Sequence, residues 1–275
     1  MILVTELLLL LILPPLLKLD PYSIDAIYFN APPSAAHWLG TDDTGRDLFA
    51  RVIFGGRVSL LVGVCSTLIS VLIGLPLGLL AGFYKGKTAA VIMRLTDVFM
   101  SIPAIILILV IVAVFEPSIS SIILVIGLTG WTEITRLINS TVISVREKDY
   151  VEAAIASGEK KSTVMLRYVL PNAIAPLWVS VAFRISSAML TESGLSFLGA
   201  GVQPPQASWG NIINSAKSIV VLSQRPWIWI PPGILLMLTV VCVNLVGEGI
   251  RDALDPKMKR GIRWKKGKRS LRSET

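Results

Sequence analysis

Six apolar runs limit the fold of this chain more than any other feature. They cover residues 2–17, 58–83, 98–115, 119–138, 173–199 and 228–250. A helix of about 20 apolar residues crosses the hydrocarbon core of a bilayer, so runs of this length predict membrane spans. The composition agrees, because 53% of the 275 residues are hydrophobic and only 16% are charged. The sequence therefore predicts an all-α membrane protein with about six transmembrane helices, and it argues against a soluble or disordered chain.

The first run, residues 2–17, is short for a span. A helix of this length reaches about 24 Å, whereas the hydrocarbon core is about 30 Å thick. The run carries Glu6, and it lacks the basic start and the small-residue cleavage site of a signal peptide. We therefore expect either a partial, truncated first helix or a true start that lies upstream.

Positive charges indicate the orientation. If the C-terminus is inside, the predicted inner segments 84–94, 136–167 and 251–275 hold 19 of the 26 Lys and Arg residues. Cytoplasmic loops carry this excess in membrane proteins, so we expect both termini to be cytoplasmic. Residues 251–275 alone hold ten of these charges, which beside an apolar span indicates a cytoplasmic tail rather than a nucleic-acid site.

The chain then divides into four parts. Residues 1–17 form the short first helix, and 18–57 form an external segment. Residues 58–250 form a core of five spans, which includes a long inner connection at 139–172. The basic tail completes the chain. Cys65 and Cys242 lie inside apolar runs, so we expect core residues rather than a disulfide or a metal site.

The inner connection has a pattern of its own. Two short helices are expected at residues 150–157 and 160–169, joined at Gly158, with Pro171 ending the second. Val151, Ala154 and Ile155 share a face of the first. Neither helix is long enough to be stable alone in water. From composition, the segment is either an amphipathic linker on the membrane surface or a docking element that needs a partner groove.

The spacing of one motif favours the docking element. Glu152, Ala153 and Ala154 are followed by Gly158 and then by Leu170-Pro171. This stretch resembles the EAA loop of binding-protein-dependent ABC import permeases, with Tyr168 where that family has isoleucine. Residues 37–60, 192–213 and 244–256 resemble segments of the "C" type permease subunits for dipeptides, oligopeptides and nickel.

The resemblance implies a type I ABC importer permease fold in the cytoplasmic membrane of a prokaryote. It implies a second homologous permease, one or two ATP-binding subunits that hold ATP and magnesium, and an extracytoplasmic solute-binding protein. This chain would bind membrane lipid but no cofactor and no nucleic acid. The solute would be a di- or oligopeptide or, alternatively, nickel or a metal chelate. The residues that would couple to the ATPase are Asp149, Tyr150, Glu152, Ala153, Ala154, Gly158, Leu170 and Pro171.

Charged residues within spans are further candidates. Arg184 shares a helix face with Ser187 and Thr191 in the fifth predicted span, and Glu192 follows near its outer end. These four residues either form a hydrogen-bond network between helices or line a water-filled path for a polar solute, and the sequence leaves both open. Asp97 and Glu133 lie near the inner ends of spans and are expected at the membrane interface.

A charged cluster stands in the external segment. Its candidate residues are Gly40, Thr41, Asp42, Gly45, Arg46 and Asp47. The cluster is either a solvated surface whose charges pair with one another, or a surface that docks to the solute-binding protein or the second permease. We favour packing within the complex.

Other classes of function have weaker support. Residues 82–88 read GFYKGKT, one residue short of a P-loop, and they follow a span rather than a strand. His37 is the only histidine and lies outside the spans, which argues against an intramembrane Ser–His pair and a zinc motif. We therefore expect no catalytic residue and no metal site. An ion channel or a membrane scaffold stays open as an alternative, because a ring formed by oligomerisation is invisible in one chain.

Overall fold

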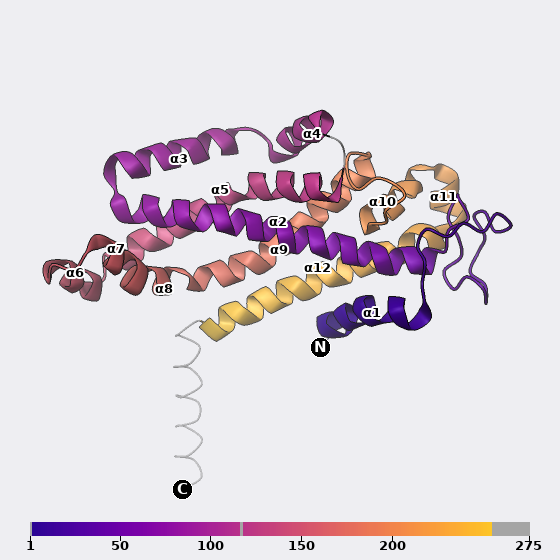
Figure 1. Ribbon diagram of the computed structural model, residues 1–275, viewed down its shortest axis with the longest axis horizontal. Helices are drawn as coiled ribbons and strands as arrows, with labels where there is room; N and C mark the ends of the chain where they lie inside the picture. Colours follow the sequence, from indigo (N-terminus) through magenta and orange to yellow (C-terminus); the bar gives the residue numbers. More distant parts are fainter. Residues whose placement is uncertain (1, 116–117, 255–275) are drawn as a thin grey trace, which may run out of the picture.

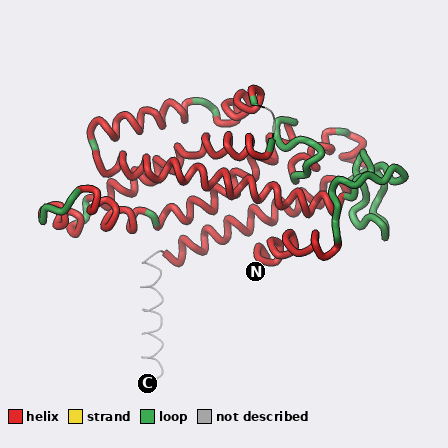
Figure 2. The backbone as a smooth tube through the Cα atoms, viewed as in Figure 1, coloured by secondary structure: helices red, strands yellow, loops and turns green. Residues whose placement is uncertain are grey.

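The computed structural model describes residues 2–115 and 118–254, which form an elongated helical bundle (Figure 1). Helices make up nearly all of it, and loops gather mainly at one end (Figure 2). Within the described ranges, β pairing is limited to two isolated bridges, Ile24 with Arg46 and Thr41 with Asp47. The all-α prediction is therefore confirmed. Most of the predicted basic tail, residues 255–275, lies outside the described residues.

Three helices are long and apolar enough to cross a membrane. They are α2 (Leu48–Tyr84), α5 (Ile119–Arg146) and α12 (Pro226–Leu254). Two bent pairs bring the number to five if each pair is one span. These are α3 (Gly86–Ser101) with α4 (Ala104–Val114), and the segment Lys161–Ala173 with α9 (Ala175–Leu198). The shorter apolar helix α1 (Ile2–Leu17) is the sixth apolar element that the sequence predicts.

Helix α2 begins ten residues before its apolar run, inside the segment predicted to be external. Asp47 caps it, since its carboxylate accepts a hydrogen bond of 2.8 Å from the backbone N–H of Ala50. The helix has 37 residues and is therefore about 55 Å long. Because a hydrocarbon core is about 30 Å thick, α2 must extend well beyond it.

The third predicted span, 98–115, is not one straight helix. Helix α3 ends at Ser101, and α4 leaves it at an angle of 82°. Pro103 has no backbone N–H, and its ring disfavours helical geometry for the residue before it. Ile102 accordingly has an extended conformation, with φ −93° and ψ 127°. Proline therefore breaks this run rather than being accommodated within a continuous helix.

Glycines let α2 and α5 pack closely. Gly74, Gly78 and Gly82 recur every four residues on α2. A Cβ added at these positions would lie 2.6 to 2.7 Å from the nearest atoms, all of which belong to α5. Small residues at this spacing let two helix backbones approach each other in a membrane. A hydrogen bond of 2.9 Å from the Ser70 hydroxyl to the carbonyl of Gly127 also joins the two helices.

Helix α1 is held by an arginine that compensates for two prolines. Pro14 and Pro15 lack N–H groups, so the carbonyls of Leu10 and Leu11, four residues earlier, lose their helical partners. Arg57 of α2 donates to both carbonyls, through Nε at 2.6 Å and Nη2 at 2.9 Å. Backbone groups freed inside a membrane protein need such replacement donors.

The two ends of the bundle differ. At one end lie α6 (Asp149–Ala156), α7 (Lys161–Thr163), the π-helix η1 (Val164–Val169) and α8 (Leu170–Ala173) (Figure 1). The opposite end holds the loop 18–47, α10 (Trp209–Asn214), η2 (Ser215–Lys217) and α11 (Ile219–Gln224). Element η1 ends at Val169, and Pro171 lies in the first turn of the next helix, α8, where proline is tolerated. The 55° bend follows at the junction of α8 and α9.

Candidate functional site

The inner connection is fixed to the bundle by buried apolar side chains. Val151 and Ala154 of α6 and Val164 and Val169 of η1 are buried. They share a core cluster with residues from the ends of α2 and α5, including Phe83 and Val142. The segment is therefore a packed extension of these helices, so a force applied to it would reach the spans.

Most of the predicted coupling residues lie on the outside of this element. Asp149, Tyr150, Glu152, Ala153, Gly158 and Pro171 are exposed, Leu170 is partly buried, and Ala154 is buried. Exposed apolar side chains accompany them, with Tyr150 44%, Ile155 42% and Leu166 54% exposed. Of the three residues predicted to share a face of α6, Val151 and Ala154 are buried and Ile155 is exposed. This element therefore presents to its surroundings a mixed acidic and apolar surface.

Gly158 makes the turn between the two short helices, as expected. Its φ of +78° lies in the left-handed region that favours glycine. A Cβ at Gly158 would meet no atom within 4 Å. Nearby, the hydroxyl of Tyr168 donates a hydrogen bond of 2.8 Å to Oε1 of Glu159, which joins the turn to η1. Tyrosine at this position thus supplies a polar contact that isoleucine would lack.

Arg184 lines a cavity between α4, α5 and α9. Its Nη1 lies 3.3 Å from Oε2 of Glu133, and its Nη2 donates to the carbonyl of Ile126 at 3.2 Å. The cavity has a volume of about 430 Å³, and Ser187 and Thr191 also line it. Three of the four residues predicted for a translocation path therefore share one cavity.

Gly130 makes room for this arginine. A Cβ at Gly130 would lie 1.8 Å from Nη2 of Arg184. Glu133 was expected only at the membrane interface. The sequence did not reveal its contact with Arg184, because Arg184 is 51 residues away on another helix. Asp97 instead pairs with Arg136, with 2.7 Å between Oδ1 and Nη2, and both side chains are about half exposed.

Glu192 belongs to a different environment from the other three predicted path residues. Its side chain is fully buried and does not line the cavity of Arg184. Its Oε2 accepts from Ser59 at 2.9 Å, and its Oε1 accepts from Ser196 at 2.7 Å. The Ser59 hydroxyl also accepts from the backbone N–H of Trp209 at 3.3 Å. Glu192 thus ties α9 to α2 and to the start of α10.

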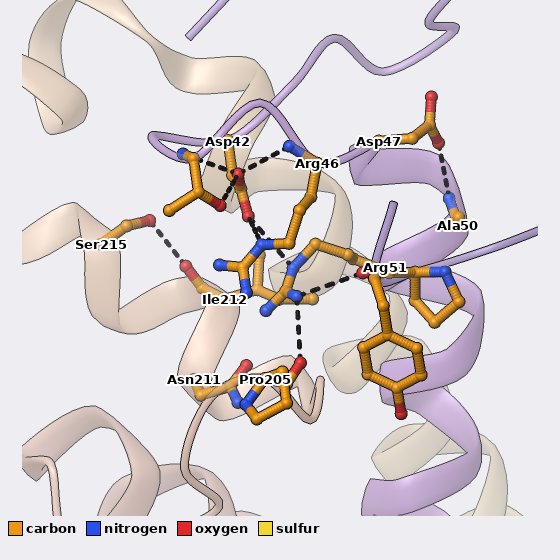
Figure 3. A network of polar contacts seen from close by, with 12 residues as sticks. Asp42, Arg46, Asp47, Ala50, Arg51, Pro205, Asn211, Ile212 and Ser215 are labelled. Carbon is orange, nitrogen blue, oxygen red and sulfur yellow. Dashed lines mark hydrogen bonds and ion pairs between the residues drawn. The ribbon is translucent and has the colours of Figure 1, made fainter. Parts of the chain in front are cut away.

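The external cluster forms a network within this chain (Figure 3). Oδ2 of Asp42 lies 2.8 Å from Nε of Arg46 and 3.3 Å from Nε of Arg51. Arg51 also donates to the carbonyls of Pro21 and Pro205, at 3.4 and 3.3 Å. Asp42 and Arg51 are 7% and 4% exposed, so this part of the cluster is buried rather than solvated.

The remaining cluster residues shape the loop. Gly40 and Gly45 have φ of +76° and +81°, and a Cβ at either would lie within 2.4 Å of a backbone carbonyl oxygen. The hydroxyl of Thr41 donates to the carbonyl of Tyr28. Oδ2 of Asp47 lies 2.8 Å from Nδ1 of His37. Packing within this chain therefore accounts for these residues, and a docking role stays a prediction.

Hydrogen bonds set the ionisation of Asp42. Burial by itself would raise the pKa of its carboxyl group, but the bonds from the backbone and side chain of Thr44, the backbone N–H of Arg46 and the Arg46 charge outweigh it. The net result is a pKa below the ordinary value of 3.8. Asp42 is therefore a stable anion that holds the loop against α2.

Sequence reasoning missed Arg57, Gly130, Glu133 and Ser59 as positioning residues. The Pro14-Pro15 pair was a usable signal for Arg57, because two adjacent prolines in a helix leave two carbonyls that need donors. The other three depend on partners far along the chain, and no local pattern marks them.

Comparison with known proteins gives the family. Residues 74–260 match the family model described as binding-protein-dependent transport system inner membrane component. A Brucella suis protein with a peptide permease name is 41% identical over 94% of this chain and 85% of its own length. The dipeptide transport system permease protein DppC of Alkalihalophilus pseudofirmus is 37% identical over 94% of this chain and 85% of its own length. The glutathione transport system permease protein GsiD of Pectobacterium atrosepticum is 37% identical over 88% of this chain and 81% of its own length.

Solved structures agree on the fold. An inward-facing structure of the MetNI methionine ABC transporter superposes with a TM-score of 0.65 at 18% identity, and the match covers 76% of this chain and 98% of that one. An amino acid ABC transporter superposes with a TM-score of 0.54 at 15% identity, and the match covers 77% of this chain and 94% of that one. The predicted type I importer permease fold is confirmed. By fold, family model and relatives, this chain belongs to the inner membrane components of binding-protein-dependent transport systems, the ABC importer permeases.

Proposed function

We propose that this chain is a transmembrane permease subunit of an ATP-driven importer and that it moves its solute by alternating access. The arrangement of the inner connection carries this proposal. Its buried face is fixed to the ends of α2 and α5, while Tyr150, Ile155 and Leu166 are exposed beside the EAA motif. An isolated chain gains nothing from such a surface, whereas a partner cleft could cover it.

The chain would act as a lever rather than as a catalyst. ATP-binding subunits, which hold ATP and magnesium, would move the inner connection when they close. Because Val151, Val164 and Val169 are packed against α2 and α5, the motion would rotate these helices as rigid bodies. Shifting a two-state equilibrium from 1:99 to 99:1 takes about 5.5 kcal/mol, which a packed element can transmit.

The relatives favour peptides as the solute. Two carry names for the transport of dipeptides and of glutathione, which is itself a small peptide. We therefore propose uptake of di- or oligopeptides across the cytoplasmic membrane of a prokaryote. The partners would be a second permease, one or two ATP-binding subunits and an extracytoplasmic solute-binding protein. Nickel or a metal chelate is the alternative solute, and an uptake assay with both solutes separates the two.

Gly158 tests the coupling role. We expect Gly158→Asp to insert normally and to reduce uptake to background. The added side chain meets no atom of this chain, and aspartate tolerates the left-handed region better than most residues, so the fold should survive. The new charge would instead meet the ATPase. Gly158→Asn is the matched control, because it has the same size without the charge, and it should retain most of the uptake. Normal uptake by Gly158→Asp would contradict the coupling role.

Purification separates the importer from its rivals. A gentle affinity purification from the native host, with every co-purifying protein identified, should recover a second permease and one or two ATPases. Recovery of this chain alone, under conditions in which a known transporter stays intact, would favour the ion channel or the scaffold.

A further inference from the structure

The cavity beside Arg184 contains a charge pair that the importer role alone does not explain. We infer that this cavity is a binding site for a zwitterionic solute, whose carboxylate is taken by Arg184 and whose ammonium group is taken by Glu133. The inference rests on the proposed importer function and adds to it a solute class and two named contacts within the membrane domain.

Arg184 and Glu133 reach the cavity from different helices. Arg184 comes from α9 and Glu133 from α5, and 3.3 Å separates Nη1 from Oε2. The arginine side chain is 12% exposed, whereas the glutamate side chain is 62% exposed. The surrounding protein therefore encloses the Arg184 side chain much more than the Glu133 side chain. The Glu133 carboxylate has room to turn toward a ligand. A charge pair between two predicted spans is by default a functional candidate.

The described hydrogen bonds of Arg184 use only Nη1 and Nη2. Its Nε is buried and has no hydrogen-bond partner among the described residues. A guanidinium carries five N–H donors in a planar fork that matches a carboxylate with two parallel bonds. A free carboxylate in place of Glu133 would form two parallel bonds with the guanidinium, whereas Glu133 forms one.

A zwitterion can replace the ion pair without changing the charge of the cavity. Its carboxylate takes the place of Glu133 beside Arg184, and its ammonium group then compensates the released Glu133. A ligand with only an ammonium group would draw Glu133 away and leave Arg184, whose side chain is 12% exposed, without an anion, which is expensive away from water. A ligand with only a carboxylate would leave Glu133 without a compensating charge. This exchange selects for molecules that carry both charges, as unblocked peptides and amino acids do.

The rest of the lining suits this class of ligand. The hydroxyl residues Thr129, Ser187 and Thr191 line the cavity together with apolar residues such as Ile105 and Leu190. Polar and apolar groups contribute almost equally to the wall, which suits a small polar solute, and a volume of about 430 Å³ is within the usual range of small-molecule sites. The N-terminus of α4, formed by Pro103 and Ala104, also lines the cavity, and a helix N-terminus favours a negative group.

Uptake by the complete reconstituted importer tests the site, with its solute-binding protein, second permease and ATPases present. The probes are dialanine, its C-terminal amide and its N-acetyl form, each at a concentration that saturates the solute-binding protein. All permease variants share one solute-binding protein, so its own selection cancels when variants are compared. Arg184→Gln should lower the uptake of dialanine relative to that of the amide by about tenfold. Glu133→Gln should lower the uptake of dialanine relative to that of the N-acetyl form by a similar factor.

Asp97→Asn is the matched control. It removes a charge pair that also joins two helices, at 2.7 Å from Arg136, but that does not line the cavity. Its uptake ratios should equal those of the wild type. If Arg184→Gln and Glu133→Gln also keep the wild-type ratios, the zwitterion site is wrong although the importer function stands. If the wild-type complex takes up none of the probes, and no other peptide, the proposed peptide solute itself fails.

A second measurement tests the amide and the N-acetyl form even if the solute-binding protein does not bind them. Saturation-transfer NMR on the same complex in nanodiscs, without the solute-binding protein, detects weak binding of millimolar ligand. Dialanine should give a signal that Arg184→Gln reduces and Arg184→Lys partly restores, while Asp97→Asn leaves it unchanged. An equal signal from dialanine and from both blocked forms would overturn the inference.

Discussion

Arg57 illustrates at the scale of single residues how a polar side chain can be a structural requirement inside a membrane protein. It donates to the carbonyls of Leu10 and Leu11, which Pro14 and Pro15 leave without helical partners. Its guanidinium also lies 5.2 Å from the centre of the Phe54 ring. One cation therefore satisfies the backbone of α1 and fixes that helix to α2.

We expect Arg57→Ala to destabilise the protein by about 1–3 kcal/mol, because the carbonyls of Leu10, which is buried, and Leu11 both lose a charged donor. The measurement is the thermal unfolding midpoint of the purified complex in detergent. Replacing both Pro14 and Pro15 by alanine restores the N–H groups of the helix, so the cost of Arg57→Ala should shrink in that background. An unchanged cost would show that the arginine acts through its other contacts.

Asp42 gives the external loop a dependence on pH. Its pKa is lowered in the folded protein, so its contribution to stability is fully present above the ordinary value of 3.8 and is lost as pH falls through the lower folded value. We expect the unfolding midpoint to fall steeply with pH in this acidic range. Asp42→Asn should be less stable at neutral pH by about 2–4 kcal/mol, because Arg51 stays buried without its anion, and should lose less on acidification. Parallel pH profiles for the two proteins would contradict this assignment.

At the scale of elements, close packing between α2 and α5 controls the bundle. The glycines of α2 face Ile134, Ile138 and Val142, so the two backbones approach each other where any side chain would interfere. The inner connection is anchored to the adjoining ends of these same two helices. A disturbance of this interface should therefore affect both stability and coupling.

Gly78→Ala is the test of this interface. The added Cβ would lie 2.6 Å from the carbonyl oxygen of Thr135, which is backbone and cannot move aside cheaply. We expect a loss of about 1–3 kcal/mol, measured as a lower unfolding midpoint in detergent. Gly249→Ala in α12 is the matched control. Its Cβ meets nothing within 4 Å, so alanine there should be neutral or slightly stabilising. Equal effects at the two sites would count against the close approach.

For the whole molecule, the two ends of the bundle are expected on opposite sides of the membrane. The EAA motif lies at one end, and the loop 18–47 with α10 and α11 lies at the other (Figure 1). The count of Lys and Arg predicts that the first end is cytoplasmic.

Single cysteines at exposed positions test this orientation. Ser23 lies in the external loop and Ser157 follows α6, and both side chains are exposed. With Cys65 and Cys242 replaced by alanine, a membrane-impermeant maleimide added to intact cells should label Ser23→Cys and leave Ser157→Cys unlabelled until the membrane is opened. The reverse pattern would invert the topology and assign the EAA motif to the outside.

The fold class followed from the sequence, because lipid leaves few solutions for a polar backbone. Apolar runs that cross a bilayer must satisfy their N–H and C=O groups within the segment, so helices were the expected answer. The turn of the inner connection was also readable, since its motif lies within about 20 residues and the turn has the left-handed conformation of Gly158. Helix bounds were less predictable. Helix α2 begins after Asp47 because of a side-chain hydrogen bond, and the run 98–115 breaks at Pro103 because of the proline ring. Average hydropathy contains neither effect.

Tertiary structure alone decided which polar residues act together. The sequence grouped Arg184 with Glu192, eight residues along one helix, but the fold separates them. Arg184 pairs with Glu133, 51 residues away, beside a cavity, whereas Glu192 bonds to Ser59, 133 residues away, in a buried serine network. The period of a helix tells which residues share its face. The rotation and packing of neighbouring helices determine what that face meets, and these depend on contacts between segments far apart in the sequence.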